Sequence, residues 1–90
     1  MKLENLKPGM CVDLRVGTFC IVVKDNYNYN NLLVNLKTGK EIFLLKHFDD
    51  NMRCRRYEKA KENKLYDIVR VYSDFTKLKM YWEREVKNDN

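Results

Sequence analysis

Alternating apolar and polar residues predict a β-hairpin over residues 10–24. In these two segments every second residue is apolar: Met10, Val12, Leu14 and Val16, then Phe19, Ile21 and Val23. A period of two is typical of strands that bury one face. Both apolar sets lie on one face only if the turn at Val16-Gly17 has two or four residues, which sets Leu14 opposite Phe19.

A second hairpin is predicted over residues 32–45, where alternation continues on both sides of a Lys-Thr-Gly step. Gly39 supplies the left-handed residue of a three-residue loop. That loop sets Val34 opposite Ile42. Apolar residues also occupy the second face, so we expect this face to be partly covered: Leu33, Phe43 and Leu45.

The stretch of residues 46–65 has two interpretations, and both remain open at this point. Asp49 or Asp50 is a suitable N-cap for a helix over residues 51–63. The apolar stripe of such a helix is thin, because few of its residues recur at helical spacing. The alternative is an extended excursion with at most one short helical turn.

Two more strands are predicted near the C-terminus. Residues 66–72 are rich in β-branched and aromatic residues, and residues 78–86 alternate again, with Arg84 interrupting the apolar side. Six short strands with tight turns indicate a mainly β fold, either a small antiparallel barrel or a strongly bent sheet. The predicted core includes Leu14, Phe19, Ile21, Val34, Ile42 and Trp82.

The length and composition favour a single domain over residues 1–90, with one modest core. No apolar run approaches the roughly 18 residues of a membrane span, and the N-terminus lacks the apolar region of a secretory signal. Three cysteines at irregular spacing indicate reduced thiols and a cytoplasmic location. The net charge of +5 is moderate and fits an anionic partner.

Basic residues concentrate in one segment, residues 53–64. Arginine forks match phosphate oxygens and carboxylates, and aromatic rings offer stacking surfaces. The Asn-rich connection over residues 25–31 carries two tyrosines, which are common in recognition surfaces. The simpler interpretation of both segments is solvated polar chain. As candidate partner-binding residues we take Arg53, Arg55, Arg56, Tyr57, Lys59, Tyr27 and Tyr29.

No catalytic constellation is apparent, so we expect a protein that is not an enzyme and uses no cofactor. Cys54 lies among arginines that would lower its pKa, and His47 is the single histidine, but no motif joins them. No pair of closely spaced cysteines anchors a metal site. In the predicted hairpin Cys11 and Cys20 take diagonal positions on one face, which is poor disulfide geometry.

Several segments together carry a resemblance. The opening LKPGMCVDLRVGTFCIVV resembles that of SH3-like barrels, and the set KPGM, LVNLKTGKEI, YDIVRVY and WERE is similar to small phage- and prophage-encoded proteins of low-GC Gram-positive bacteria. The resemblance implies a small SH3-like antiparallel barrel of about six strands, with room for one short helix in residues 50–63. It transfers no catalytic or binding positions, because its motifs are strands and turns.

That group includes many inhibitors of host defence. The resemblance therefore implies a phage-type binding protein that inhibits or sequesters a host component, of the anti-defence or anti-CRISPR-like kind. Its partner is expected to be a host protein, a protein–nucleic acid complex or an anionic signal molecule, with no membrane involved. The alternative is an SH3-like module that binds nucleic acid through the basic segment.

Overall fold

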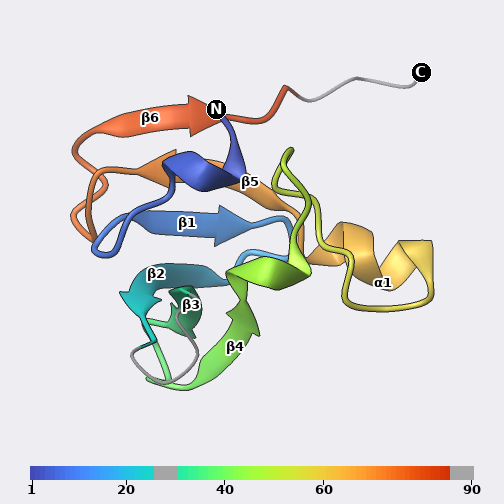
Figure 1. The fold of residues 1–90 in the computed structure, drawn as a ribbon. Coiled ribbons are helices and arrows are strands. Elements are labelled where there is room, and N and C mark those ends of the chain that lie inside the picture. The colour runs from blue at the N-terminus through green and yellow to red at the C-terminus, as the bar shows by residue number, and fades with distance from the viewer. Residues whose placement is uncertain (26–30, 86–90) are drawn as a thin grey trace.

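The described residues form one antiparallel β-sheet of six strands. The computed structural model describes residues 1–25 and 31–85. Within that part of the chain the sheet order is β4-β3-β2-β1-β5-β6, which places β4 and β6 at its edges (Figure 1). The strands are β1 (Cys11–Leu14), β2 (Phe19–Lys24), β3 (Asn31–Asn35), β4 (Glu41–Leu44), β5 (Ile68–Tyr72) and β6 (Met80–Glu83). The predicted mainly β fold is confirmed, although the sheet is not closed into a barrel.

Helices contribute little to the described chain. The single α-helix there is α1 (Ala60–Leu65), which lies at one end of the sheet (Figure 1). Two 3-10 turns, η1 (Leu3–Asn5) and η2 (Leu45–His47), precede β1 and follow β4. No helix among the described residues is long and apolar enough to cross a membrane.

The first hairpin forms where predicted, but its register is not the predicted one. Its loop has three residues, because the Leu14 N–H donates to the Thr18 carbonyl at 2.9 Å and Gly17 adopts φ +100°. A three-residue loop that ends in a left-handed glycine is a common hairpin connection. Val12 therefore pairs with Cys20 rather than with Ile21, and β2 presents its opposite face to the core.

The core consequently differs from the predicted set. Of that set, only Leu14 belongs to the buried cluster, while Ile42 and Trp82 pack at its margin. The other three predicted core residues, Phe19, Ile21 and Val34, lie outside it because their alternation places them on the second face of the sheet. The buried cluster consists of Leu6, Val12, Leu14, Cys20, Val22, Leu33, Phe43, Leu45, Phe48, Met52, Cys54, Ile68 and Val71.

The second hairpin carries a β-bulge that the sequence pattern did not predict. Gly39 adopts φ +71°, as predicted, but the Asn35 N–H bonds to the Lys40 carbonyl, which leaves a four-residue loop. The register shifts between Leu33 and Val34, so Val34 pairs with Glu41 instead of Ile42. The extra residue in β4 kinks this edge strand.

Residues 48–59, between η2 and α1, form an extended excursion, so the helix predicted over residues 51–63 is wrong for most of its length. A short helix does form, but it is the six-residue α1, which is longer than the single turn of the alternative and only overlaps the short helix expected in residues 50–63. Phe48 and Cys54 form an isolated antiparallel bridge, and Met52 has a φ of +63°, which is incompatible with a continuous helix. The Met52 side chain is completely buried in the core. The apolar residue of this segment is therefore buried from a left-handed turn and not from the face of a helix.

Candidate binding surface

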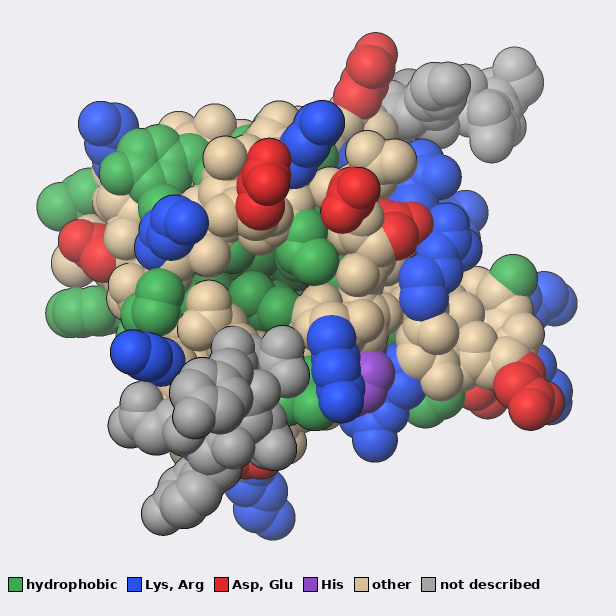
Figure 2. All heavy atoms as spheres, viewed as in Figure 1, with side chains coloured by type: hydrophobic (Ala, Val, Ile, Leu, Met, Phe, Trp, Pro, Cys, Tyr) green, Lys and Arg blue, Asp and Glu red, His purple; other side chains and the backbone are tan. Residues whose placement is uncertain are grey.

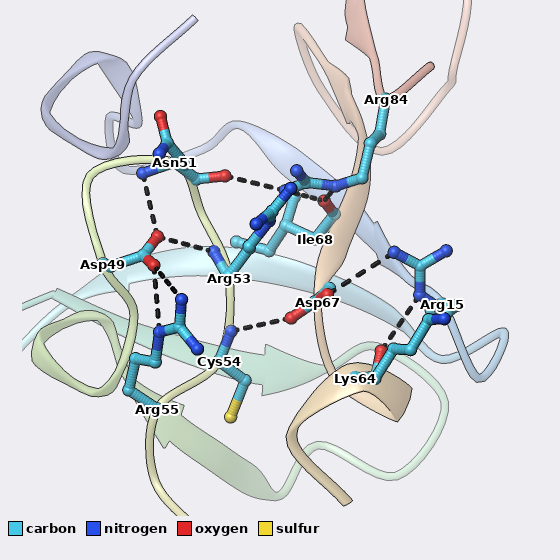
Figure 3. A network of polar contacts seen from close by, with 10 residues as sticks. All are labelled: Arg15, Asp49, Asn51, Arg53, Cys54, Arg55, Lys64, Asp67, Ile68 and Arg84. Atoms are coloured by element: carbon cyan, nitrogen blue, oxygen red, sulfur yellow. Dashed lines mark hydrogen bonds and ion pairs between the residues drawn. The ribbon is translucent and has the colours of Figure 1, made fainter. Parts of the chain in front are cut away.

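Four arginines from three separate parts of the chain meet beside the excursion. Arg15 follows β1, Arg53 and Arg55 belong to the excursion, and Arg84 follows β6. They surround the carboxylates of Asp49 and Asp67 (Figure 3). Lys and Arg side chains gather along the side of the molecule between the end of β6 and α1 (Figure 2). We call Arg15, Arg53, Arg55 and Arg84 the arginine surface.

The excursion presents its arginines outward because it alternates like a strand. Met52 and Cys54 point into the core and are at most 1% exposed, whereas Arg53 and Arg55 are exposed. This period of two was visible in the sequence as Met-Arg-Cys-Arg.

Asp49 holds the turn that starts the excursion. Its Oδ1 accepts hydrogen bonds from the backbone N–H groups of Asn51 (2.9 Å) and Arg53 (3.1 Å), and its Oδ2 lies 2.9 Å from an Arg55 guanidinium nitrogen. Burial opposes ionisation of this carboxyl, but the hydrogen bonds from Arg53, Arg55 and Asn51 outweigh it and lower its pKa. The residue expected to cap a helix therefore organises a tight turn instead.

Asp67 joins the excursion to the rest of the fold. It is 6% exposed and precedes β5. Its Oδ1 accepts the backbone N–H of Cys54 at 2.9 Å, and its Oδ2 lies 3.4 Å from Arg15. The Arg15 Nε–H also donates to the Lys64 carbonyl at 3.0 Å. One buried carboxylate thus positions both the excursion and the arginine that follows β1.

Arg84 is the residue of this surface that sequence reasoning missed. Its guanidinium donates to the carbonyls of Ile68 (2.9 Å and 3.1 Å) and Asn51 (2.7 Å), and it forms no ion pair within the described part of the chain. Burial lowers its pKa, and the positive charges of Arg53 and Arg15 lower it further, against the opposing effect of Asp67. The available signal was its position, since it interrupts the apolar side of the last strand pattern.

The remaining predicted binding residues do not join this surface as a group. Arg56 turns away from it, because its guanidinium lies 5.4 Å from the Phe43 ring centroid and donates to the Ile42 carbonyl at 3.1 Å. Tyr57 packs at the margin of the core. Lys59 is exposed directly before α1. The candidate tyrosines of the Asn-rich connection, Tyr27 and Tyr29, lie outside the described residues.

The cysteine chemistry considered from the sequence finds no support in the geometry. The three cysteines are free and buried. Burial raises the Cys54 pKa, and this effect outweighs the neighbouring Arg56 and Arg55, so the expected lowering is wrong. Cys11 and Cys20 lie on opposite faces of the sheet rather than on one face, because Cys20 pairs directly with Val12. Within the described residues no cluster of three His, Cys, Asp or Glu side chains is arranged to hold a metal ion.

His47 has a structural role beside the edge strand β4. Its Nδ1 accepts the Leu44 backbone N–H at 3.2 Å. Burial lowers its pKa, as do the charges of Arg56 and Lys46, which favours the neutral imidazole that this bond requires. The Arg56 guanidinium also donates to the Ile42 carbonyl, so two side chains form hydrogen bonds with the backbone of β4.

A second polar cluster lies on the other face of the sheet and is internally paired. Asp13, 8% exposed, accepts the Tyr72 hydroxyl at 2.8 Å and lies 3.6 Å from both Arg70 and Lys77. Lys77 also covers the Phe19 ring, with its Nζ 4.2 Å from the ring centroid. These contacts explain how a charged residue is buried in the middle of β1.

Comparison of the chain with protein-family models, with curated proteins and with solved structures finds no match.

Proposed function

We propose that this chain is a non-enzymatic binding protein that covers an acidic surface of a host protein and thereby inhibits or sequesters it. The observation that carries the proposal is the arginine surface, which gathers four guanidinium groups around two carboxylates. Guanidinium forks pair with carboxylates through two parallel hydrogen bonds. The resemblance to phage-encoded proteins supports the inhibitory form of the proposal.

Three of these arginines are held in place before any partner arrives, and one of them, Arg55, is held by Asp49 Oδ2 at 2.9 Å. Arg15 is fixed by Asp67 and the Lys64 carbonyl, and Arg84 is fixed by two backbone carbonyls. Ordering a long side chain costs free energy during association, about 0.5–1.5 kcal/mol for each one. Side chains that are already ordered avoid much of this cost, so the surface is suited to specific recognition.

A protein partner is favoured over free nucleic acid by the modest charge of the chain. The net charge is +5, and acidic groups stand among the arginines. Nucleic-acid affinity depends on many phosphate contacts, each of which releases a counterion. The second candidate, an SH3-like module that binds nucleic acid, is supported by the Lys and Arg side chains that gather beside α1 (Figure 2).

The proposal is tested with a variant that removes charge from the surface but keeps the backbone hydrogen bonds of Asp49 and Asp67. Arg53→Gln with Arg55→Gln does this, whereas Arg56 is left unchanged because it packs on Phe43. The matched control is Lys59→Gln with Lys61→Gln, which removes the same charge from exposed positions near α1.

Host proteins are captured from lysate with and without nuclease, and the captured protein is then purified for affinity measurements. We expect one complex that survives nuclease, weakens at least about tenfold in the arginine variant and is retained by the lysine control. Fluorescence anisotropy with labelled DNA and RNA is the opposing test. Two results together would favour nucleic acid over a protein partner. The first is submicromolar affinity whose logarithm falls linearly with the logarithm of salt concentration, with a slope of about −0.9 for each duplex phosphate contacted. The second is loss of this binding in the arginine variant.

A further inference from the structure

A small pocket opens beside the arginine surface, between the start of β5 and the end of β6. Its volume is about 180 Å³, and its lining consists of Arg15, Val69, Arg70, Glu83, Arg84 and Glu85. A space of this size accommodates one small group of a partner rather than a whole ligand. Three of the six lining residues are arginines, so the chemistry of that group is set mainly by guanidinium donors.

The arginines of the pocket differ in how their charges are balanced. Arg70 is paired with Glu83 at 2.6 Å and lies 3.6 Å from Asp13. Arg15 shares Asp67 with the Cys54 backbone N–H. Arg84 is half-buried, donates to carbonyl oxygens and lies 5.0 Å from the Trp82 ring centroid, but it forms no ion pair among the described residues. A partly desolvated cation without a counterion is costly, and a bound anion relieves that cost.

We propose that this pocket binds a single carboxylate, supplied by an acidic side chain of the protein partner. The inference deepens the proposed function, since it rests on an acidic partner and names the group that anchors it. Arg84 and Arg15 supply the N–H donors, and Val69 supplies an apolar wall. The anchoring carboxylate would give Arg84 a direct ion pair, which none of the described residues forms with it.

The acidic residues of the pocket favour a carboxylate over a phosphate group. Glu83 and Glu85 both line it, and Asp67 lies next to Arg15. The charges of Arg15, Arg70 and Arg84 are nearly cancelled by those of Glu83, Glu85 and Asp67. The second negative charge of a phosphate monoester therefore gains little net attraction here, while its removal from water costs more than that of a carboxylate. Repulsion from like charges is an effective means of rejecting the wrong partner.

The test uses two small probes and the intact protein. The acetylated and amidated tetrapeptides Gly-Glu-Gly-Gly and Gly-phosphoSer-Gly-Gly differ in the anion that they present. Arginine Nε–H signals are followed by NMR at constant ionic strength up to about 20 mM peptide, where weak single-contact affinities are measurable. We expect saturable shifts of the Arg15 and Arg84 signals with the Glu peptide, at least as tight as with the phosphopeptide.

Three variants locate the binding. Arg84→Gln should weaken the Glu peptide at least about tenfold, read from the Arg15 signal. Glu85→Gln should tighten it about two- to fivefold, because one repulsive charge is removed close to the pocket. Glu85 is exposed, so this variant tests the pocket even if Arg84→Gln fails to fold. Arg55→Gln, on the same surface but outside the lining, should leave the affinity within about twofold.

Failure of the inference is distinguishable from failure of the proposed function. The absence of saturable shifts with the Glu peptide, or tighter binding of the phosphopeptide, overturns the carboxylate pocket. Such a result does not contradict the proposed function, which is tested by the capture of a host protein through Arg53 and Arg55. Conversely, peptide binding without such a host protein overturns the proposed function and supports the pocket.

Discussion

Asp67 should stabilise the fold through two separable contacts, and two substitutions distinguish them. In Asp67→Asn the amide oxygen still accepts the Cys54 N–H, but the ion pair with Arg15 is lost. That pair is partly exposed, with side-chain exposures of 36% and 9%, so its loss should cost only ~0.5–1 kcal/mol. In Asp67→Ala the Cys54 N–H also loses its acceptor. Cys54 is 1% exposed, and a buried unpaired N–H costs a further ~1–3 kcal/mol.

Equilibrium urea unfolding, followed by the fluorescence of the single tryptophan and by circular dichroism, measures both costs. The expected losses of about 0.5–1 and about 1.5–4 kcal/mol compare with a total stability of roughly 5–14 kcal/mol for a domain of this length. Asp50→Asn, at an exposed position of the excursion, is the control and should stay within about 0.5 kcal/mol. If the Ala and Asn variants of Asp67 were equally stable, the hydrogen bond to Cys54 would contribute nothing and the reasoning would be wrong.

Three further outcomes are expected. Val22→Ala should lower the free energy of unfolding in urea by ~2–3 kcal/mol, because Val22 lies in the core. This loss should be larger than that of Ile21→Ala, although Val22→Ala deletes fewer atoms. A larger loss for Ile21→Ala would support the register predicted from the sequence. The native thiols should react slowly with a disulfide reagent, since burial raises the Cys20 pKa to about 12, and three should react after unfolding; fast native labelling would contradict this. Folding lowers the pKa of Asp49, so its carboxylate stabilises the protein above the ordinary Asp pKa, and this effect is lost as pH falls through the lower pKa of the folded state. The wild-type protein should therefore lose more stability between about pH 6 and about pH 3 than Asp49→Asn does. Equal losses would refute this role of Asp49.

The sequence by itself determined where the strands lie. Alternation and turn glycines are local signals, and the six predicted segments coincide with β1 to β6 to within a few residues at each end. The signal for the exposed arginines of the excursion was also local, since apolar and basic residues alternate in the sequence over residues 52–55. These features depend on residues that are close together in the chain, so they can be predicted without the tertiary structure.

The face that each strand buries was decided only by the tertiary structure. One residue more or less in a hairpin loop inverts every side chain of the strand that follows. The residues around Gly17 suit a three-residue loop as well as the two- and four-residue loops expected. Both faces of β2 carry apolar residues, so its pattern alone did not choose between Val22 and Ile21.

The arginine surface likewise required the folded chain. Arg15 bonds to groups 49 and 52 residues away, and Arg84 bonds to a carbonyl 33 residues away. No periodicity extends over such separations, because these contacts follow from sheet order: β1 lies next to β5, and β5 lies next to β6. The sequence thus specified the elements and a source of positive charge, and the antiparallel pairing of distant strands brought that charge together at one place.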